Sequence, residues 1–171
     1  MRGMAVFLGN PGQRYGETRH NAARRLYPFL GLPELRAWKF RAGALWIAHD
    51  RVVMVEPACQ MNRSGTAVQQ LLGFYKLSPD RLLVAHDDTE RPLGSAELRK
   101  GGGHRGNNGL RDIQQKLGTA DFFRLGIGIG RPAYGSLSSY VLGRFAPSEL
   151  PDLEAGLQQA ASLLDEWARG R

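Results

Sequence analysis

Short apolar runs recur along most of the chain, and residues that favour turns separate them. Runs of this length that end in Gly, Pro, Asn or Asp are typical of strands covered on both faces. For example, the run at Val6–Leu8 enters a tight turn at Gly9–Gly12, and His49–Arg51 suits a hairpin turn. The predicted strands are Val6–Leu8, Trp38–Arg41, Ala44–Ala48, Val52–Val55, Leu82–Ala85 and Phe123–Ile129.

Between these runs, apolar residues spaced three and four positions apart predict amphipathic helices. Thr18 has the character of a helix N-cap, and the helix that follows it is expected to stop near Gly31. Residues 131–135 are expected to form a loop. The apolar faces of the predicted helices are marked by Ala22, Ala23, Leu26 and Phe29, by Val68, Leu71, Leu72 and Tyr75, by Leu110, Ile113 and Leu117, and by the stretch Leu150–Trp167.

Strands that alternate with helices predict an α/β fold. We expect one domain over residues 1–171, built on a twisted, mostly parallel or mixed sheet flanked by helices. Ligands of such sheets bind beyond the carboxyl ends of the strands. Asn10 and the stretch His86–Asp88 both follow predicted strands, so the pattern predicts that they approach one another.

The charge balance favours a polyanionic partner. Lys and Arg outnumber Asp and Glu by 23 to 16, which gives a net charge of +7, and the pI is about 10.1. A field of this sign attracts nucleic acid above all. The C-terminal stretch from residue 147 is acidic, so it is not expected to form the main anion-binding surface.

The cysteine count and the hydropathy of the chain indicate its cellular compartment. A single cysteine excludes an internal disulfide, and four histidines with one thiol are too few for a structural zinc cluster. No apolar run is long enough to span a membrane, and the first residues lead into a strand rather than a signal peptide. We therefore expect a cytoplasmic protein that makes no membrane contact.

His20 is the candidate general base of the sequence. It falls in the first turn of a predicted helix, where the dipole is expected to depress its pKa and favour the neutral ring. Asp87 could orient the ring and stabilise the imidazolium formed during proton transfer. The alternative interpretation of His20 is a plain surface histidine. For His86–Asp88 it is metal ligation, and for Asp87 and Asp88 it is also helix capping or a surface turn.

Two further stretches carry candidate binding groups. Asn62 lies between a strand and a helix, where its amide could cap the helix or point a donor into a cleft. The glycine-rich stretch Gly101–Gly109 contains G-x-G-x-x-G but follows a polar segment, so a dinucleotide site is disfavoured. Its free backbone amides, flanked by Arg99, Lys100 and Arg105, suit a phosphate better, unless the stretch is a disordered flap.

Taken together, these stretches resemble the bacterial peptidyl-tRNA hydrolase family, whose members cleave the ester between a peptide and its tRNA. The motifs occur in the family's order over about residues 5–145, which makes the resemblance specific although each motif alone is weak. The matching stretches are Leu8–Gly12 with Tyr15, Thr18–Asn21, Met61–Gly65, Val84–Asp88, Gly101–His104, Asn108–Leu110 and Gly126–Gly130.

The resemblance implies that His20 is the base that activates water and that Asp87 orients it. It also implies that Asn10, Asn62 and Asn108 position the peptide end and the terminal adenosine. Met61 would shape the cleft wall, and Tyr15 would belong to the substrate-binding set.

The implied partner is the acceptor end of peptidyl-tRNA, with phosphate contacts from Arg99, Lys100 and Arg105. No metal, cofactor or membrane is implied, and a monomer is expected. The alternative functions are a non-catalytic RNA-binding module on the same scaffold and a general hydrolase of small esters or peptides.

Three positions depart from the family pattern, and the first is Gln60, which stands where the family often has an aromatic residue. Asn107 stands where the family commonly has a histidine, so a hydrogen bond from that ring must be remade by an amide or lost. Gly126 stands where the family has a basic residue that clamps the terminal phosphate.

Overall fold

The computed structural model describes residues 1–170; Arg171, the last residue of the predicted domain, lies outside the described residues. All seven strands belong to one mixed sheet with the order β2-β3-β4-β1-β5-β7-β6. The four central strands run parallel, while β2, β3 and β6 pair antiparallel at the two sides. The strands are β1 (Gly3–Phe7), β2 (Lys39–Arg41), β3 (Ala44–His49), β4 (Val52–Pro57), β5 (Leu82–Asp88), β6 (Ala96–Lys100) and β7 (Phe123–Gly128).

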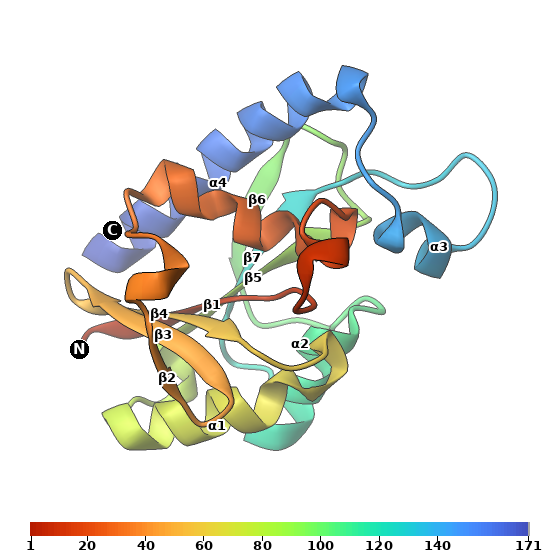
Figure 1. Ribbon diagram of the computed structural model, residues 1–171. Coiled ribbons are helices and arrows are strands. Elements are labelled where there is room, and N and C mark those ends of the chain that lie inside the picture. Colours follow the sequence, from red (N-terminus) through yellow and green to blue (C-terminus); the bar gives the residue numbers. More distant parts are fainter. Residues whose placement is uncertain (171) are drawn as a thin grey trace.

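Helices cover both faces of the sheet, as expected for a single α/β domain (Figure 1). The α-helices are α1 (Ser64–Tyr75), α2 (Asn108–Leu117), α3 (Leu137–Leu142) and α4 (Leu150–Arg169). The 3₁₀ helices are η1 (Gln13–Tyr15), η2 (Arg19–Leu30), η3 (Leu35–Ala37), η4 (Met61–Arg63), η5 (Pro79–Arg81) and η6 (Pro147–Glu149). No helix within residues 1–170 has the length and apolar character needed to cross a membrane.

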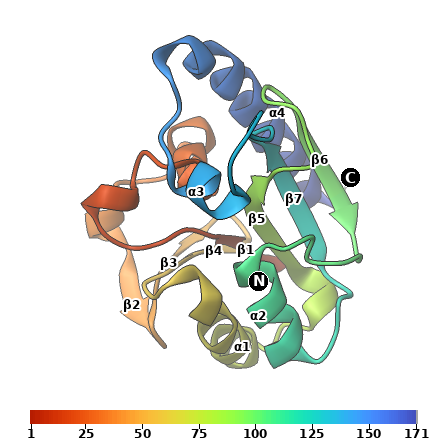
Figure 2. The same cartoon turned by 90° about the vertical axis from the view of Figure 1, so that its right-hand side faces the viewer.

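Two hydrophobic cores form because alternate residues of each strand point to opposite faces of the sheet. On one face, Leu83 and Ala85 of β5 pack with residues of η2 and α4. On the other face, Leu82 and Val84 pack with residues of α1 and α2. Figure 2 shows this arrangement, with α1 and α2 below the sheet and α4 above it. The prediction that the central strands are covered on both faces is confirmed.

Two local features at the start of η2 and along it differ from the prediction. The segment Arg19–Leu30 is a 3₁₀ helix rather than an α-helix, with non-helical backbone angles at Asn21 and a proline, Pro28, inside it. Proline cannot donate the backbone bond that an α-helix interior requires. Thr18 precedes this helix but does not cap it, because its hydroxyl donates to the carbonyl oxygen of Tyr15 at 2.8 Å.

Strand β6 and helix α3 were not predicted. In β6 only Ala96 and Leu98 face the apolar core beneath α4, and the strand lies at the sheet edge. Its other residues are polar, so the segment shows no apolar run that would predict a strand. Helix α3 has six residues and buries none of them fully. Figure 1 shows that α3 lies beyond the sheet, at the side where the parallel strands end.

Candidate active site

A cleft of about 410 Å³ opens at the carboxyl edge of the parallel strands. Its walls come from the loops that follow β1, β4 and β5, from the start of η2, from the loop before α2, and from α3. The predicted approach of Asn10 to His86–Asp88 is confirmed, since all of these residues line the cleft. The lining residues are Asn10, His20, Gln60, Met61, Asn62, His86–Thr89, His104–Asn108, Leu137, Ser138, Val141 and Leu142.

His20 and Asp87 form a hydrogen-bonded pair in this cleft, with 2.8 Å between Nδ1 of His20 and Oδ2 of Asp87. The Asp87 side chain is only 3% exposed, whereas that of His20 is 14% exposed. Because a carboxylate can only accept, Nδ1 of His20 carries the proton. In the neutral ring Nε2 is then the atom with a free lone pair, as a general base requires.

The expectation of a depressed pKa for His20 is wrong. Burial lowers the pKa of the ring, but the negative charge of Asp87 and the hydrogen bond to it raise the pKa by more, so it lies above the usual 6.5. The predicted dipole effect assumed a regular α-helix, whereas His20 is the second residue of a 3₁₀ helix that is irregular at Asn21. The carboxylate partner therefore decides the direction of the shift.

His86, the neighbouring histidine, has a different environment. Its Nδ1 lies 2.8 Å from the carbonyl oxygen of Asp87 and must donate to it. Burial lowers the pKa of His86 and keeps the ring neutral. Its Nε2 is buried and has no hydrogen-bond partner among residues 1–170. Of the two rings, His20 is therefore the one with a basic nitrogen open to the cleft.

Asn10 is held in place by two other segments. Its backbone N–H donates to Oδ1 of Asn21, and its carbonyl oxygen accepts from Nδ2 of Asn21, both at 2.9 Å. The backbone N–H of Met61 donates to Oδ1 of Asn10 at 2.8 Å. This bond fixes the orientation of the Asn10 amide, whose Nδ2 has no partner within the described part of the chain.

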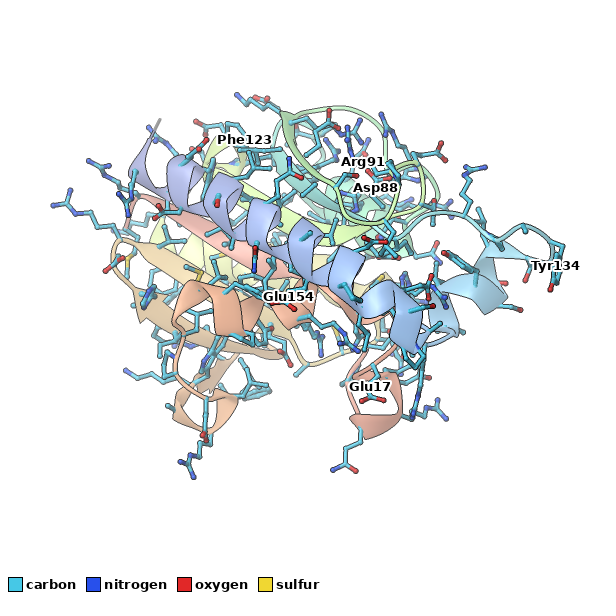
Figure 3. All side chains as sticks on the ribbon, turned by 90° about the horizontal axis from the view of Figure 1, so that it is seen from above. Glu17, Asp88, Arg91, Phe123, Tyr134 and Glu154 are labelled. Atoms are coloured by element: carbon cyan, nitrogen blue, oxygen red, sulfur yellow. The ribbon has the colours of Figure 1, made fainter. Side chains whose placement is uncertain are left out.

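Most of the predicted site residues lie together. Asn62, Asn108 and Arg105 are exposed along the walls, and Met61 is buried in the floor. The Asn62 side chain makes no capping hydrogen bond to α1. Of the two interpretations, helix cap or donor that points into the cleft, the second therefore fits better. Figure 3 shows Arg91 beside Asp88, and Nε of Arg91 lies 3.7 Å from Oδ2 of Asp88.

Three predicted residues do not line the cleft. Tyr15 lies in η1 and accepts a hydrogen bond from Arg14. Lys100 forms an ion pair with Asp121, with 3.2 Å between Nζ and Oδ1. Arg99 lies on β6, and its guanidinium group is close to the glycine-rich loop. A Cβ built at Gly102 would lie 3.4 Å from one of its nitrogens.

The structure also gives a reason for glycine at position 126. A Cβ there would lie only 2.7 Å from Oδ2 of Asp88, so no side chain fits without displacing that carboxylate. Arg105 of the glycine-rich loop lies near the same carboxylate, with 4.0 Å between Nη1 and Oδ2 of Asp88.

Two contributions to the cleft were missed in the sequence. Leu137, Val141 and Leu142 of α3 form an apolar wall, and the i, i+4, i+5 spacing of these residues was the available signal. Asn107 donates from Nδ2 to Oδ1 of Asp87 at 3.0 Å. No sequence pattern pairs these two residues, because the contact joins a strand end to a loop twenty positions later.

A larger hollow of about 840 Å³ lies elsewhere, among Phe29, Met54 and Leu164. None of the predicted site residues lines it. Within residues 1–170 no three His, Cys, Asp or Glu side chains gather as metal ligands would.

The fold and the cleft define an α/β domain with a polar ligand site, containing a His–Asp pair, at a sheet edge. A family model described as "Peptidyl-tRNA hydrolase" matches residues 4–171. The chain therefore belongs to the peptidyl-tRNA hydrolase family, which confirms the resemblance of its motifs.

Several known proteins are similar to this chain over most of its length. The peptidyl-tRNA hydrolase of Trichlorobacter lovleyi is 44% identical over 163 residues, which cover 92% of this chain and 84% of that protein. The peptidyl-tRNA hydrolase of Marinobacter nauticus is 42% identical, and the match covers 98% of this chain and 89% of that protein. The crystal structure of peptidyl-tRNA hydrolase from Acinetobacter baumannii has a TM-score of 0.86 at 33% identity, covering 98% of this chain and 89% of that one.

Proposed function

We propose that this enzyme hydrolyses the ester bond of peptidyl-tRNA with His20 as general base and Asp87 as its orienting carboxylate. The observation that carries the assignment is the 2.8 Å bond between Nδ1 of His20 and Oδ2 of Asp87 in the cleft wall. Membership of the family supports the substrate and the ester hydrolysis.

In the proposed reaction Nε2 of His20 takes a proton from a water molecule, whose oxygen attacks the ester carbonyl carbon. Asp87 stabilises the imidazolium that forms. The tetrahedral intermediate then expels the 3′-terminal ribose oxygen of the tRNA, which receives the proton from His20. The products are a free peptide acid and a free tRNA.

Amide donors are proposed to position the ester and to stabilise the negative charge on its oxygen. Asn10 is suited to this role, because its Oδ1 is bonded to Met61 and its Nδ2 is free within the described part of the chain. Asn62 and Asn108 are exposed residues that line the same cleft. The apolar wall of α3 offers a surface for side chains of the peptide.

Basic residues beside the cleft are proposed to contact tRNA phosphates. Arg105 is at the cleft wall, and Arg99 is next to the glycine-rich loop. Lys100 would have to exchange its ion pair with Asp121 for a phosphate, and Tyr15 would contact the substrate only where it extends beyond the cleft.

We also propose that the enzyme acts as a monomer in the cytoplasm, without a cofactor. All groups invoked in the reaction come from a single chain, which supports the monomer. The cytoplasmic setting is supported by the tRNA substrate.

The test compares His20→Ala with the wild type in release of N-acetyl-aminoacyl residues from tRNA, with a chelator present. Loss of general-base catalysis is expected to reduce kcat by about 10²- to 10⁴-fold. His49→Ala is the matched control, because His49 lies at the end of β3 outside the cleft. Near-normal turnover by His20→Ala would contradict the assignment, and tight tRNA binding without cleavage by the wild type would favour an RNA-binding module.

A further inference from the structure

Asn107 uses both ends of its side-chain amide. Its Oδ1 accepts from the backbone N–H groups of Gly109 at 3.0 Å and Leu110 at 3.1 Å, and so caps the N-terminus of α2. Its Nδ2 donates to Oδ1 of Asp87 at 3.0 Å. Because both the oxygen and the nitrogen have partners, the amide can occupy this site in one orientation only.

The Asp87 carboxylate is thereby held at both oxygens. Oδ2 bonds to His20 and Oδ1 bonds to Asn107, and the carboxylate is almost fully buried. Without Asn107, Oδ1 would lose its only hydrogen bond from a side chain within residues 1–170. A buried carboxylate oxygen that loses its donor either rotates toward another donor or draws in water, and either change alters its bond to His20.

We propose that Asn107 is a positioning residue for ester hydrolysis: it anchors Asp87 to the first turn of α2 and thereby holds His20 at the angle required for proton transfer. This inference rests on the proposed function. In this proposal Asn107 does more than stabilise α2 as its N-cap. Through its bond to Asp87 it also links the glycine-rich loop to the His20–Asp87 pair.

An uncharged amide suits this position better than a carboxylate. The other titratable side chains that line the cleft are His86 and Asp88 from β5 and His104 and Arg105 from the loop, and α3 adds none. Arg19, which precedes His20 in η2, is not part of the lining and forms an ion pair with Glu149. A second carboxylate at position 107 would face Asp87 at hydrogen-bond distance. Like charges so close disfavour ionisation, and the added negative charge would raise the pKa of His20 further.

The first test uses Asn107→Ser, because serine caps helices as well as asparagine but is too short to bridge to Asp87. We expect the thermal unfolding midpoint to stay near the wild-type value and KM to change little. In contrast, kcat for N-acetyl-aminoacyl-tRNA should fall by about 10- to 100-fold, as for loss of a group that orients a reacting residue. Unchanged kcat in a folded Asn107→Ser variant would overturn the inference.

A double-mutant cycle separates positioning from a structural role. If Asn107 acts through Asp87, Asn107→Ser should cause no further loss of kcat in an Asp87→Asn background. A full additional loss in that background would mean that Asn107 acts independently of Asp87, and would overturn the inference.

The third measurement does not depend on activity. Asn107→Asp keeps the capping oxygen but replaces the donor with a charge, and we expect it to raise the pKa of His20 in an NMR titration of the ring. An unchanged His20 titration would overturn this inference while the proposed function stood. A wild type that does not cleave peptidyl-tRNA would overturn the proposed function, and this inference with it.

Discussion

The Arg24 guanidinium lies between the ends of β1 and β4 and holds the loops on one side of the cleft. It donates to the carbonyl oxygens of Gly9 at 2.9 Å and Pro57 at 2.8 Å, and pairs with Oε1 of Glu56 at 3.1 Å. A planar group with five N–H donors can serve all of these acceptors at once, which lysine cannot. A Cβ at position 9 would lie 2.5 Å from the Arg24 side chain, so the loop needs glycine there.

At the same scale, the His20–Asp87 bond predicts the pH dependence of the reaction. The base must be neutral, and Asp87 raises the pKa of His20 above 6.5, so kcat/KM should rise with pH through a midpoint above that value. In Asp87→Asn the negative charge that raises the pKa of His20 is gone, while burial, which lowers it, remains. The midpoint should then move to lower pH, and the plateau should fall by about 10²- to 10⁴-fold.

A pH–rate profile of both proteins, with N-acetyl-aminoacyl-tRNA as substrate, measures this shift. An acidic limb at the same pH in wild type and Asp87→Asn would show that a group other than His20 controls it.

At the scale of elements, the close approach of α1 and α2 supports one wall of the cleft. A Cβ at Gly65 would lie 2.5 Å from the backbone oxygen of Asp112. In addition, the backbone N–H of Gly65 donates to Oδ2 of Asp112 at 2.6 Å. Since α1 follows directly after Met61 and Asn62, its position relative to α2 sets the position of these site residues.

This packing predicts that replacing two glycines of α1 with alanine has opposite effects on the free energy of unfolding. Gly65→Ala should push α1 from α2 and lower the free energy of unfolding by about 1–3 kcal/mol. A Cβ at Gly73 would meet no atom of another element within 4 Å, so Gly73→Ala should raise the free energy of unfolding by about 0.5–1 kcal/mol through helix propensity. Urea denaturation measures both; equal effects of the two substitutions would contradict the packing argument.

At the scale of the whole molecule, charge is distributed unevenly. The net charge is +7, yet α4 with the preceding turn is acidic, and Arg105 is the basic residue at the wall of the cleft itself. Figure 1 shows that the C-terminal end of α4 lies at the opposite side of the molecule from α3. We therefore place the contact with tRNA on the α3 and glycine-loop side.

This placement predicts that salt weakens the reaction on tRNA. Each phosphate contact contributes about 0.7–0.9 to the slope of log affinity against log salt, so KM for the tRNA ester should rise steeply with salt. A short ester mimic without RNA should be nearly insensitive. Arg99→Gln should reduce the slope, whereas Arg169→Gln, an equal loss of charge at the far end of α4, should leave it unchanged.

The measurement is KM for both substrates at several salt concentrations. A salt-independent KM for the tRNA ester would favour a general hydrolase of small esters.

The order of the residues was enough to predict the central strands, the amphipathic helices and the α/β class, because these depend on periodic burial, which appears directly as a pattern in the chain. It also predicted that Asn10 and His86–Asp88 would meet, since the carboxyl ends of parallel strands share one edge. The family motifs identified the candidate residues.

Only the tertiary structure decided the contacts between segments far apart in the chain. The bond of Asp87 to His20 reversed the expected pKa shift, and its bond to Asn107 joined the pair to α2. Strand β6 lies at the sheet edge and packs against α4, and its mostly polar residues carry no apolar pattern that would predict a strand. Such contacts depend on distance and orientation in space, whereas a sequence records only the order of its residues.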